Sequence, residues 1–259
     1  MTSVYGGAFA ELYDLFHGGK PYGAEVAFVD SLLRAEAAGP SERLLDIACG
    51  TGNHATGLAR MGWAVLGVDR SPEMLQIAEA KAEGLPVRFM QRDMQDLEIP
   101  ESGFDAAICL FDSIGYAVTN EAIARTLAGI RRNVRPDGLF LVEFWHAPAM
   151  VRGFDPVRVR EWQVDDGSIT RTSTTALDVT RQVAHISYRV DRSTAAGQIA
   201  VWNEEHENRF FLIQEMALFL RNADFAPLRF FAGFDAAEAI DLDTWHVLGL
   251  ARATKSVPT

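Results

Sequence analysis

The sequence predicts an α/β fold: a Rossmann-like, doubly wound, mostly parallel seven-stranded sheet with an antiparallel β insertion after the fifth strand. Up to residue 145, short apolar segments alternate with amphipathic helical segments, which is typical of parallel β-α-β units with right-handed crossovers. From about residue 157 the pattern changes. Runs rich in Val, Ile and Thr there alternate with polar residues, which predicts antiparallel strands.

The elements of the first 145 residues follow from periodicity and from breakers. Apolar residues at three- and four-residue steps on both sides of the HGGKPYG segment predict two helices within residues 5–38. Further helices are expected at 53–60, from the Ser71-Pro72 cap onward, and at 122–134. Pro136-Asp137-Gly138 predicts a turn. The strands of the sheet are expected at 43–48, 63–69, 87–90, 104–111 and 139–145.

The remaining sequence predicts three or four antiparallel strands, then a helix at 212–223 and strands at 227–231 and 245–251. We therefore expect one domain with four segments: a helical N-terminal lid (1–40), a cofactor-binding core (41–150), the insertion (151–210) and a return to the core sheet (211–259). An exposed strand edge needs cover, so the insertion is expected to form a homodimer surface, a wall of the substrate pocket, or both.

Composition excludes several classes of protein. The 259 residues carry 24 Lys and Arg against 35 Asp and Glu, a formal net charge of −11, which argues against nucleic-acid and anionic-membrane partners. We find neither an apolar run that could span a membrane nor a signal-peptide pattern, and expect a cytoplasmic protein. Cys49 and Cys109 are too few for a disulfide framework. They are expected to lie near each other and to stay reduced, and no metal site is expected.

The most informative stretch is a glycine loop between the first strand and its helix. GTGNHA at 50–55 satisfies the GxGxxA pattern, which lets a cofactor approach the backbone closely. Asp69 ends the second strand, where a carboxylate accepts hydrogen bonds from ribose hydroxyls. Taken alone, this combination fits NAD about as well as S-adenosylmethionine.

Two further acids separate these ligands. Asp46 lies just before the loop, where it would repel a dinucleotide pyrophosphate but attract the ammonium group of S-adenosylmethionine. Asp93 follows the third strand, where its carboxylate suits the adenine amine and the Met94 backbone N–H suits a ring nitrogen. Each acid could instead be a cap or a surface residue. Their combination favours S-adenosylmethionine.

LLDIACGTGNH, GVDRS, QRDM and LFDSIGY are similar in order and spacing to the motifs of class I S-adenosylmethionine-dependent methyltransferases, over roughly residues 5–145. The sequence further resembles bacterial amino-sugar N,N-dimethyltransferases in YDLF at 13–16, GGKPY at 18–22, SIGY at 113–116 and VEFW at 142–145. It departs from them at Asp112, where Ser is usual, and at His17, where an aromatic hydroxyl is usual. The departures concern the substrate rather than the cofactor.

The resemblance implies cofactor contacts from Tyr13, Lys20, Ala48, Asp69, Asp93, Met94 and Leu110. With the loop, its acids and the lid added, the expected cofactor-binding residues are Tyr13, Lys20, Tyr22, Asp46, Ala48, Gly50, Gly52, Asp69, Arg70, Asp93, Met94 and Leu110.

Methyl transfer from a sulfonium is an in-line displacement, so the protein mainly aligns the reactants and removes a proton from the acceptor. The crevice beyond the strand ends and the lid offer His17, Asp112, Tyr116 and His146 as catalytic candidates. Substrate contacts are expected from Trp145, His206 and Arg209. Each of these residues could instead be a cap, a core residue or an exposed residue. His54 is placed on the first helix of the core, and His185 and His246 on strand surfaces.

The leading hypothesis is therefore a methyltransferase that moves a methyl group from S-adenosylmethionine to nitrogen or oxygen of a small polar molecule, such as an amino sugar. Two alternatives remain. One is a non-catalytic binder of S-adenosylmethionine or its demethylated product, which no motif excludes. The other is a nicotinamide oxidoreductase, against which Asp46 and the Asp93-Met94 pair argue.

Overall fold

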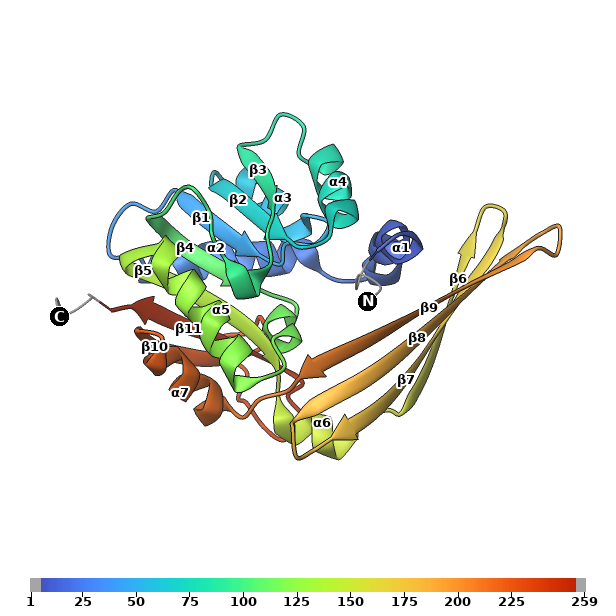
Figure 1. The fold of residues 1–259 in the computed structure, drawn as a ribbon. Coiled ribbons are helices and arrows are strands. Elements are labelled where there is room, and N and C mark those ends of the chain that lie inside the picture. The colour runs from blue at the N-terminus through green and yellow to red at the C-terminus, as the bar shows by residue number, and fades with distance from the viewer. Residues whose placement is uncertain (1–5, 255–259) are drawn as a thin grey trace.

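The computed structural model describes residues 6–254, which form a seven-stranded sheet with helices on both faces and a separate four-stranded antiparallel sheet (Figure 1). The core sheet has the order β10-β11-β5-β4-β1-β2-β3. β11 pairs antiparallel with both of its neighbours, β10 and β5, and the other neighbouring strands pair in parallel. Its strands are β1 (Arg43–Ile47), β2 (Ala64–Asp69), β3 (Val87–Gln91), β4 (Phe104–Cys109), β5 (Val134–Trp145), β10 (Phe225–Ala232) and β11 (His246–Ala253).

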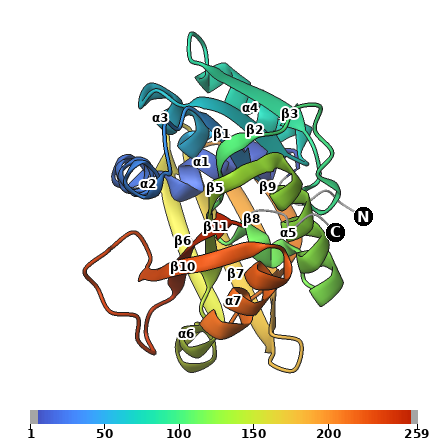
Figure 2. The same cartoon turned by 90° about the vertical axis from the view of Figure 1, so that its left-hand side faces the viewer.

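The helices divide between the two faces of this sheet, and both faces of the central strands are apolar. On β4, Ala106 and Ile108 pack toward α2 and α3, whereas Ala107 and Cys109 pack toward α5 and α7. Figure 2 shows α2 and α5 on opposite flanks. The helices are α1 (Ala8–His17), α2 (Tyr22–Glu36), α3 (Asn53–Arg60), α4 (Pro72–Lys81), α5 (Asn120–Asn133), α6 (Ala147–Gly153) and α7 (Ile213–Asn222).

The insertion after the fifth strand is a sheet of its own, ordered β6-β7-β8-β9, which we call the second sheet. In Figure 1 it extends away from the core as a long twisted arm, with α1 beside it. Phe16 of α1 packs 4.9 Å from the ring of Trp162, so α1 lies between the core and the inner face of the second sheet. Its strands are β6 (Val157–Val164), β7 (Gly167–Asp178), β8 (Val183–Thr194) and β9 (Ile199–Arg209).

The expected fold class is confirmed, with two local differences. The turn expected at 136–138 is instead a bulge inside β5. Phe104 pairs with Val134 and Ala106 pairs with Leu139, so two residue steps along β4 lie opposite five residue steps along β5. Asp137 takes a left-handed conformation there (φ 62°), which lets the extra residues leave the ladder. The short helix α6 was not expected, because seven residues are too few to show a helical period.

No helix among residues 6–254 is long and apolar enough to cross a membrane. The division into lid, core, insertion and return segment stays a prediction.

Candidate active site

The glycine loop leaves the carboxyl end of β1 next to the point where the chain order of the sheet reverses. In such sheets this crevice is where ligands bind. Gly50 has a φ of 55°, and a Cβ added there would meet no atom within 4 Å, so its backbone borders open space. Gly52 differs, because an added Cβ would lie 2.9 Å from the Cβ of Ala78. Gly52 therefore packs closely against α4, and its expected contact with the cofactor stays a prediction.

Two adjoining hollows border this loop. The cofactor cavity is lined by Asp69, Arg70, Asp93 and Met94 among others. The loop cavity is lined by Tyr22, Asp46 and Leu110 among others. Tyr13, Ala48 and Gly50 line both, so all the expected cofactor residues except Lys20 and Gly52 lie around one continuous region.

The acids of this region differ in the hydrogen bonds that their carboxylates accept. Asp69 accepts hydrogen bonds from the backbone N–H of Gly50 (2.8 Å) and of Ser71 (2.9 Å), which fixes its carboxylate at the end of β2. Burial raises the pKa of Asp69. Asp93 is exposed and accepts from the backbone N–H of Gln95 at 2.8 Å. Both carboxylates keep lone pairs for a ligand.

Asp46 provides the test of whether S-adenosylmethionine fits. Its Oδ2 atom is buried and has no hydrogen-bond partner among residues 6–254. Burial and the neighbouring Asp69 raise the pKa of Asp46 to about 8. A buried carboxyl oxygen beside a ligand cavity is costly unless a donor reaches it, and the ammonium group of S-adenosylmethionine is such a donor. The residues of this region therefore fit the cofactor.

The N-terminal helix α1 is hydrogen-bonded to the glycine loop and to the start of α3. Asp14 of α1 accepts hydrogen bonds from Thr51 (2.8 Å) and Asn53 (3.1 Å) and forms an ion pair with Lys81 of α4. Lys20 is directed elsewhere: its Nζ pairs with Glu25 and lies 4.8 Å from the ring centre of Phe111, outside the cofactor and loop cavities. Lys20 therefore forms an ion pair that anchors the start of α2, and its expected contact with the cofactor stays a prediction.

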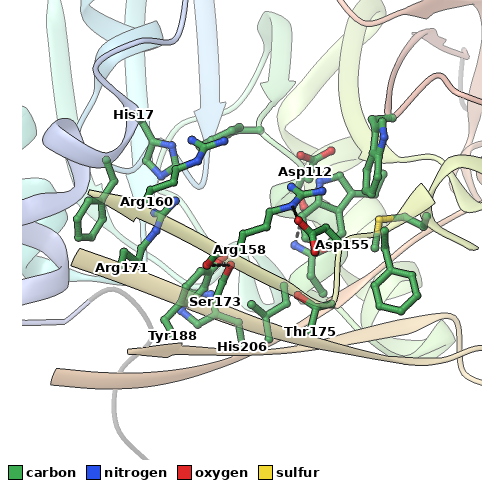
Figure 3. Close-up of a pocket in the computed structure, with 18 of the residues that line it drawn as sticks. His17, Asp112, Asp155, Arg158, Arg160, Arg171, Ser173, Thr175, Tyr188 and His206 are labelled. Carbon is green, nitrogen blue, oxygen red and sulfur yellow. Dashed lines mark hydrogen bonds and ion pairs between the residues drawn. The ribbon is translucent and has the colours of Figure 1, made fainter. Parts of the chain in front are cut away.

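A larger hollow of about 410 Å³ lies between the core and the second sheet, and we call it the acceptor cavity (Figure 3). Tyr13 and Phe111 line both this cavity and the cofactor cavity, so the two are neighbours. Five of the expected catalytic and substrate residues line it: His17, Asp112, Tyr116, Trp145 and His206.

His146 and Arg209 do not line the acceptor cavity. His146 precedes α6 and is 6% exposed, with its Nδ1 3.1 Å from the carbonyl oxygen of Thr244. Arg209 is buried near the base of the second sheet, where it binds Glu215 at 2.5 Å and Asn120 at 2.7 Å. Their polar groups hold local chain segments, and the expected catalytic role of His146 and substrate role of Arg209 stay predictions.

A carboxylate–imidazole cluster at the core end of the acceptor cavity was missed from the sequence. His246 was placed on a strand surface, yet its Nδ1 lies 3.0 Å from Asp112 and 3.3 Å from Glu143. Both carboxylates are almost fully buried. The charge of Asp112 dominates in raising the pKa of His246 to about 11, so the imidazolium acts as the cation of the cluster. Burial raises the pKa of Asp112 to about 6, against the lowering effect of His246.

The sequence held a signal for this cluster. Glu143 belongs to the VEFW motif, and His246 faces Trp145 across the β5–β11 ladder. A prediction that paired the last strand with the fifth would have placed Glu143 and His246 at the same edge of the sheet. That pairing joins positions about one hundred residues apart and leaves no trace in local periodicity.

Three arginines of the second sheet were also missed. Arg158 and Arg160 on β6 and Arg171 on β7 line the acceptor cavity. Arg158 and Arg160 are two residues apart on one strand and so share a face, which is a signal that the sequence does contain. The positive charges of these arginines alter the pKa of a neighbouring histidine. Burial, Arg171, Lys20 and Arg160 together lower the pKa of His17 to about 4, so its imidazole is neutral at pH 7.

The two cysteine thiols are unpaired, as expected. Burial raises the pKa of both, well above the ordinary range, which keeps them protonated and unreactive. Cys49 lines the loop cavity and Cys109 ends β4 inside the core.

Comparison with known proteins agrees with this geometry. Residues 44–138 match the model of a methyltransferase domain. The chain is 29% identical over 236 residues, 91% of its own length and 92% of the other's, to the Bacillus subtilis (strain 168) protein YqeM, whose name assigns it only to the methyltransferases. It is 35% identical over 170 residues, 65% of its length and 64% of the relative's, to a dTDP-3-amino-3,6-dideoxy-alpha-D-glucopyranose N,N-dimethyltransferase of Streptomyces fradiae.

Among solved structures, the chain resembles the sugar N-methyltransferase KedS8 from Streptoalloteichus sp ATCC 53650, with a TM-score of 0.80, 26% identity and 98% of each chain covered. The methyltransferase domain at residues 44–138, these relatives and the cavities around the glycine loop together identify an S-adenosylmethionine-dependent methyltransferase, with S-adenosylmethionine as its cofactor.

Proposed function

We propose that the protein methylates the amine of a small zwitterionic molecule, an amino sugar carried on a nucleoside diphosphate. The observation that carries the proposal is the separation of charge in the acceptor cavity. Arg160 and Arg171 lie at one end and Asp112 lies at the other (Figure 3). An acceptor with an anionic group and an ammonium group would complement both ends.

The arginine end is built for an anion. Arg160 and Arg171 stand directly opposite each other on β6 and β7. Arg171 lies over the rings of Phe16, Trp162 and Tyr188. Like charges in such a cross-strand pair repel, so an anion bound between the two guanidinium groups would stabilise the sheet. Among residues 6–254, Arg160 has no carboxylate within ion-pair distance. Guanidinium groups bind the oxygens of phosphates through paired hydrogen bonds, which makes a diphosphate a suitable occupant.

The opposite end suits an amine. Asp112 and Glu143 carry two carboxyl groups, and His246 supplies one positive charge between them. When both carboxylates are ionised, the cluster keeps one net negative charge and attracts an ammonium group. Phe111 and Tyr13 line both this cavity and the cofactor cavity, so the amine end adjoins the place of the methyl donor.

S-adenosylmethionine supplies an activated methyl group on a positively charged sulfur when it is bound. The contribution of the chain is to hold the acceptor nitrogen in line with that methyl, and orientation of this kind recovers about 7–11 kcal/mol of a barrier. The arginines anchor the distant end of the acceptor and Asp112 fixes its amine. Neutral His17, at the end of α1, accepts a hydrogen bond from a sugar hydroxyl. The Streptomyces fradiae relative, whose name gives a dTDP-linked amino sugar as its substrate, supports this choice of acceptor.

The experiment measures transfer of labelled methyl groups to matched acceptors. One acceptor is a dTDP-linked amino sugar and the other is the same amino sugar without the nucleotide. We expect kcat/KM to be at least about 100-fold higher for the dTDP-linked sugar, since two charge-assisted contacts of about 1.5 kcal/mol each are lost without it. Equal kcat/KM for the two, or transfer to neither, would refute the proposal.

A matched pair of variants tests whether the preference for the dTDP-linked acceptor arises at the arginines of the acceptor cavity. Arg160→Gln removes a cavity arginine and should raise the KM of the dTDP-linked acceptor about tenfold. Arg152→Gln removes an exposed arginine of α6 that pairs with Asp243 outside the cavity, and it should leave the KM unchanged. Equal effects of both changes would indicate a loss of general charge rather than of a binding group.

We also propose that the protein works in the cytoplasm as a homodimer through the outer face of the second sheet. That face exposes Val157, Val159 and Ile199, whose exposed fractions are 51%, 62% and 69%, and a second copy would cover them. The two unpaired thiols fit a reducing compartment. Sedimentation velocity should give a dimer for the wild type and a monomer for Val159→Glu. A wild-type monomer at all concentrations would refute the dimer.

A further inference from the structure

Tyr116 stands where the acceptor cavity and the cofactor cavity meet, because it lines both. It ends the 3₁₀ turn Ser113–Tyr116 that follows β4. Its hydroxyl oxygen lies 2.9 Å from the Nδ1 atom of His206 on β9. The residue at the junction of the two cavities is therefore hydrogen-bonded to a second group that can carry a proton.

His206 has its own partner on the side away from Tyr116. Its Nε2 atom lies 2.9 Å from Oε2 of Glu204, and the two residues are only 3% and 6% exposed. An ionised carboxylate only accepts hydrogen bonds, so in the neutral imidazole Nε2 is the atom that carries the proton and Nδ1 is the atom with the lone pair. The Tyr116 hydroxyl then donates to Nδ1, which turns the lone pairs of its oxygen toward the cavities.

We propose that Tyr116 takes the proton from the acceptor amine, while His206 and Glu204 are positioning residues that receive the proton of Tyr116. The inference rests on the proposed N-methylation. An N–H bond of the acceptor ammonium breaks as an O–H bond to Tyr116 forms, and the original hydroxyl proton moves to Nδ1 of His206. Glu204 stabilises the resulting imidazolium. The nitrogen lone pair then forms the bond to the methyl carbon, and the electrons of the broken S–C bond stay on sulfur.

Other groups of the acceptor cavity are less suited to this role. The low pKa of His17, about 4, makes it a weak base. Asp112 and Glu143 are held by the His246 cation and serve to attract the ammonium group. Among the described residues, the charged and titratable groups that face His206 include Tyr116, Glu204 and Tyr188 of β8, whose ring centre lies 4.9 Å from that of His206. Arg171 of β7 lies beyond Tyr188, at 5.4 Å from its ring centre.

The kinetic test compares Tyr116→Phe with Tyr188→Phe on the acceptor that the wild type methylates best. Tyr116→Phe should lower kcat about 100-fold near pH 7 with little change in KM, which is the usual size of general-base assistance. Its kcat should then rise about tenfold per pH unit toward the pKa of the acceptor amine, because solution must supply the neutral amine. Tyr188→Phe removes the hydroxyl of a ring that packs edge-on against the same imidazole, keeps that ring contact, and should show neither effect.

A second measurement needs neither cofactor nor activity. The ¹⁵N chemical shifts of the His206 ring should show a protonated Nε2 and an unprotonated Nδ1 in the wild type. Glu204→Gln should lose this bias and should lower kcat about tenfold while keeping the KM. A protonated Nδ1 in the wild type, or a Tyr116→Phe variant with wild-type kcat at every pH, would overturn the relay. Failure of the wild type to methylate any amine would refute the proposed function, and the ring tautomer would still decide on the relay.

Discussion

Asp112 Oδ2 and His246 Nδ1 lie 3.0 Å apart, although 134 positions separate the two residues in the chain. Asp112 follows β4 in a left-handed conformation, with a φ of 57°, and His246 begins the last strand of the core sheet. The contact joins the first half of the fold to its final strand at the acceptor cavity. Glu143, on the strand between them, accepts a hydrogen bond from the backbone N–H of Phe111 at 2.6 Å and so stabilises the same turn.

His246→Gln tests whether this cluster stabilises the protein as an ion pair. The folded pKa of His246, about 11, lies above its ordinary 6.5, so its contribution to stability is complete below pH 6.5 and is lost as the pH rises toward 11. The side chain is 42% exposed, which weakens the effect. At pH 7 the variant should lose about 2 kcal/mol of unfolding free energy in urea. That difference should shrink by about 0.5–1 kcal/mol per pH unit up to pH 9.5.

His185→Gln is the control, because its side chain has the same exposed fraction of 42% but pairs with Glu207 on the surface of the second sheet. It should cost less than about 0.5 kcal/mol at every pH. A pH-independent loss for His246→Gln would mean that the residue contributes packing rather than charge.

Substitutions at the two glycines of the loop should separate stability from cofactor binding. Gly52→Ala introduces a Cβ 2.9 Å from Ala78 in a backbone with a φ of 74°, so it should cost about 2–4 kcal/mol of unfolding free energy. Gly50→Ala meets no atom and should cost only about 1 kcal/mol, but its Cβ enters the space for the cofactor. Calorimetry should show weaker S-adenosylmethionine binding for Gly50→Ala. The reverse pattern would contradict the division of roles.

Asp14→Ala should loosen the N-terminal helix over the cofactor. The change removes hydrogen bonds from Thr51 and Asn53 and the ion pair with Lys81. Loss of about 1 kcal/mol of this attachment should speed the dissociation of S-adenosylmethionine about fivefold in stopped-flow fluorescence. Glu11→Ala, at an exposed position of the same helix, is the control. An unchanged dissociation rate would show that α1 does not limit the release of the cofactor.

Asp69→Ala should weaken S-adenosylmethionine binding by about 1.5–3 kcal/mol, or about 10–150-fold in Kd, because ribose loses hydrogen bonds to a charged group. Asp69→Asn keeps one acceptor for the Gly50 backbone and should lose less. Asp96→Ala changes an exposed acid beyond β3 and should leave the Kd unchanged. Unchanged affinity in both Asp69 variants would mean that the ribose lies elsewhere.

The core and the cofactor region were predictable because their signals are local. Strand and helix periods locate β1 to α5. Asp46 lies one residue before the end of β1, Asp69 ends β2 and Asp93 follows β3. Parallel strands bring these ends to one sheet edge without further information. The surroundings of Lys20 and Gly52 could not be predicted in the same way. A motif gives a residue type and a position, whereas the salt bridge of Lys20 to Glu25 and the close approach of Gly52 to Ala78 depend on the packed structure.

The acceptor side was harder, because its residues meet through pairings between distant segments. Glu143 and His246 come together only through the antiparallel β5–β11 ladder. The alternation of β6 places Arg158 and Arg160 on one face, but the side of the second sheet that turns toward the core depends on how Phe16 and Trp162 pack. A shift of β6 by one residue in its pairing with β7 would have placed both arginines on the opposite face of the second sheet.

The second sheet is hydrogen-bonded separately from the core sheet, so acceptor preference and methyl-donor binding can be inherited separately. The residues around the glycine loop and those of β6 and β7 occupy different stretches of the gene. With the acceptor bound as proposed, mutations in codons 157–178 would alter what is methylated and spare what donates the methyl group. Exchange of that stretch between relatives should therefore transplant acceptor preference, and a lineage could acquire new substrates while its methyl donor stays the same.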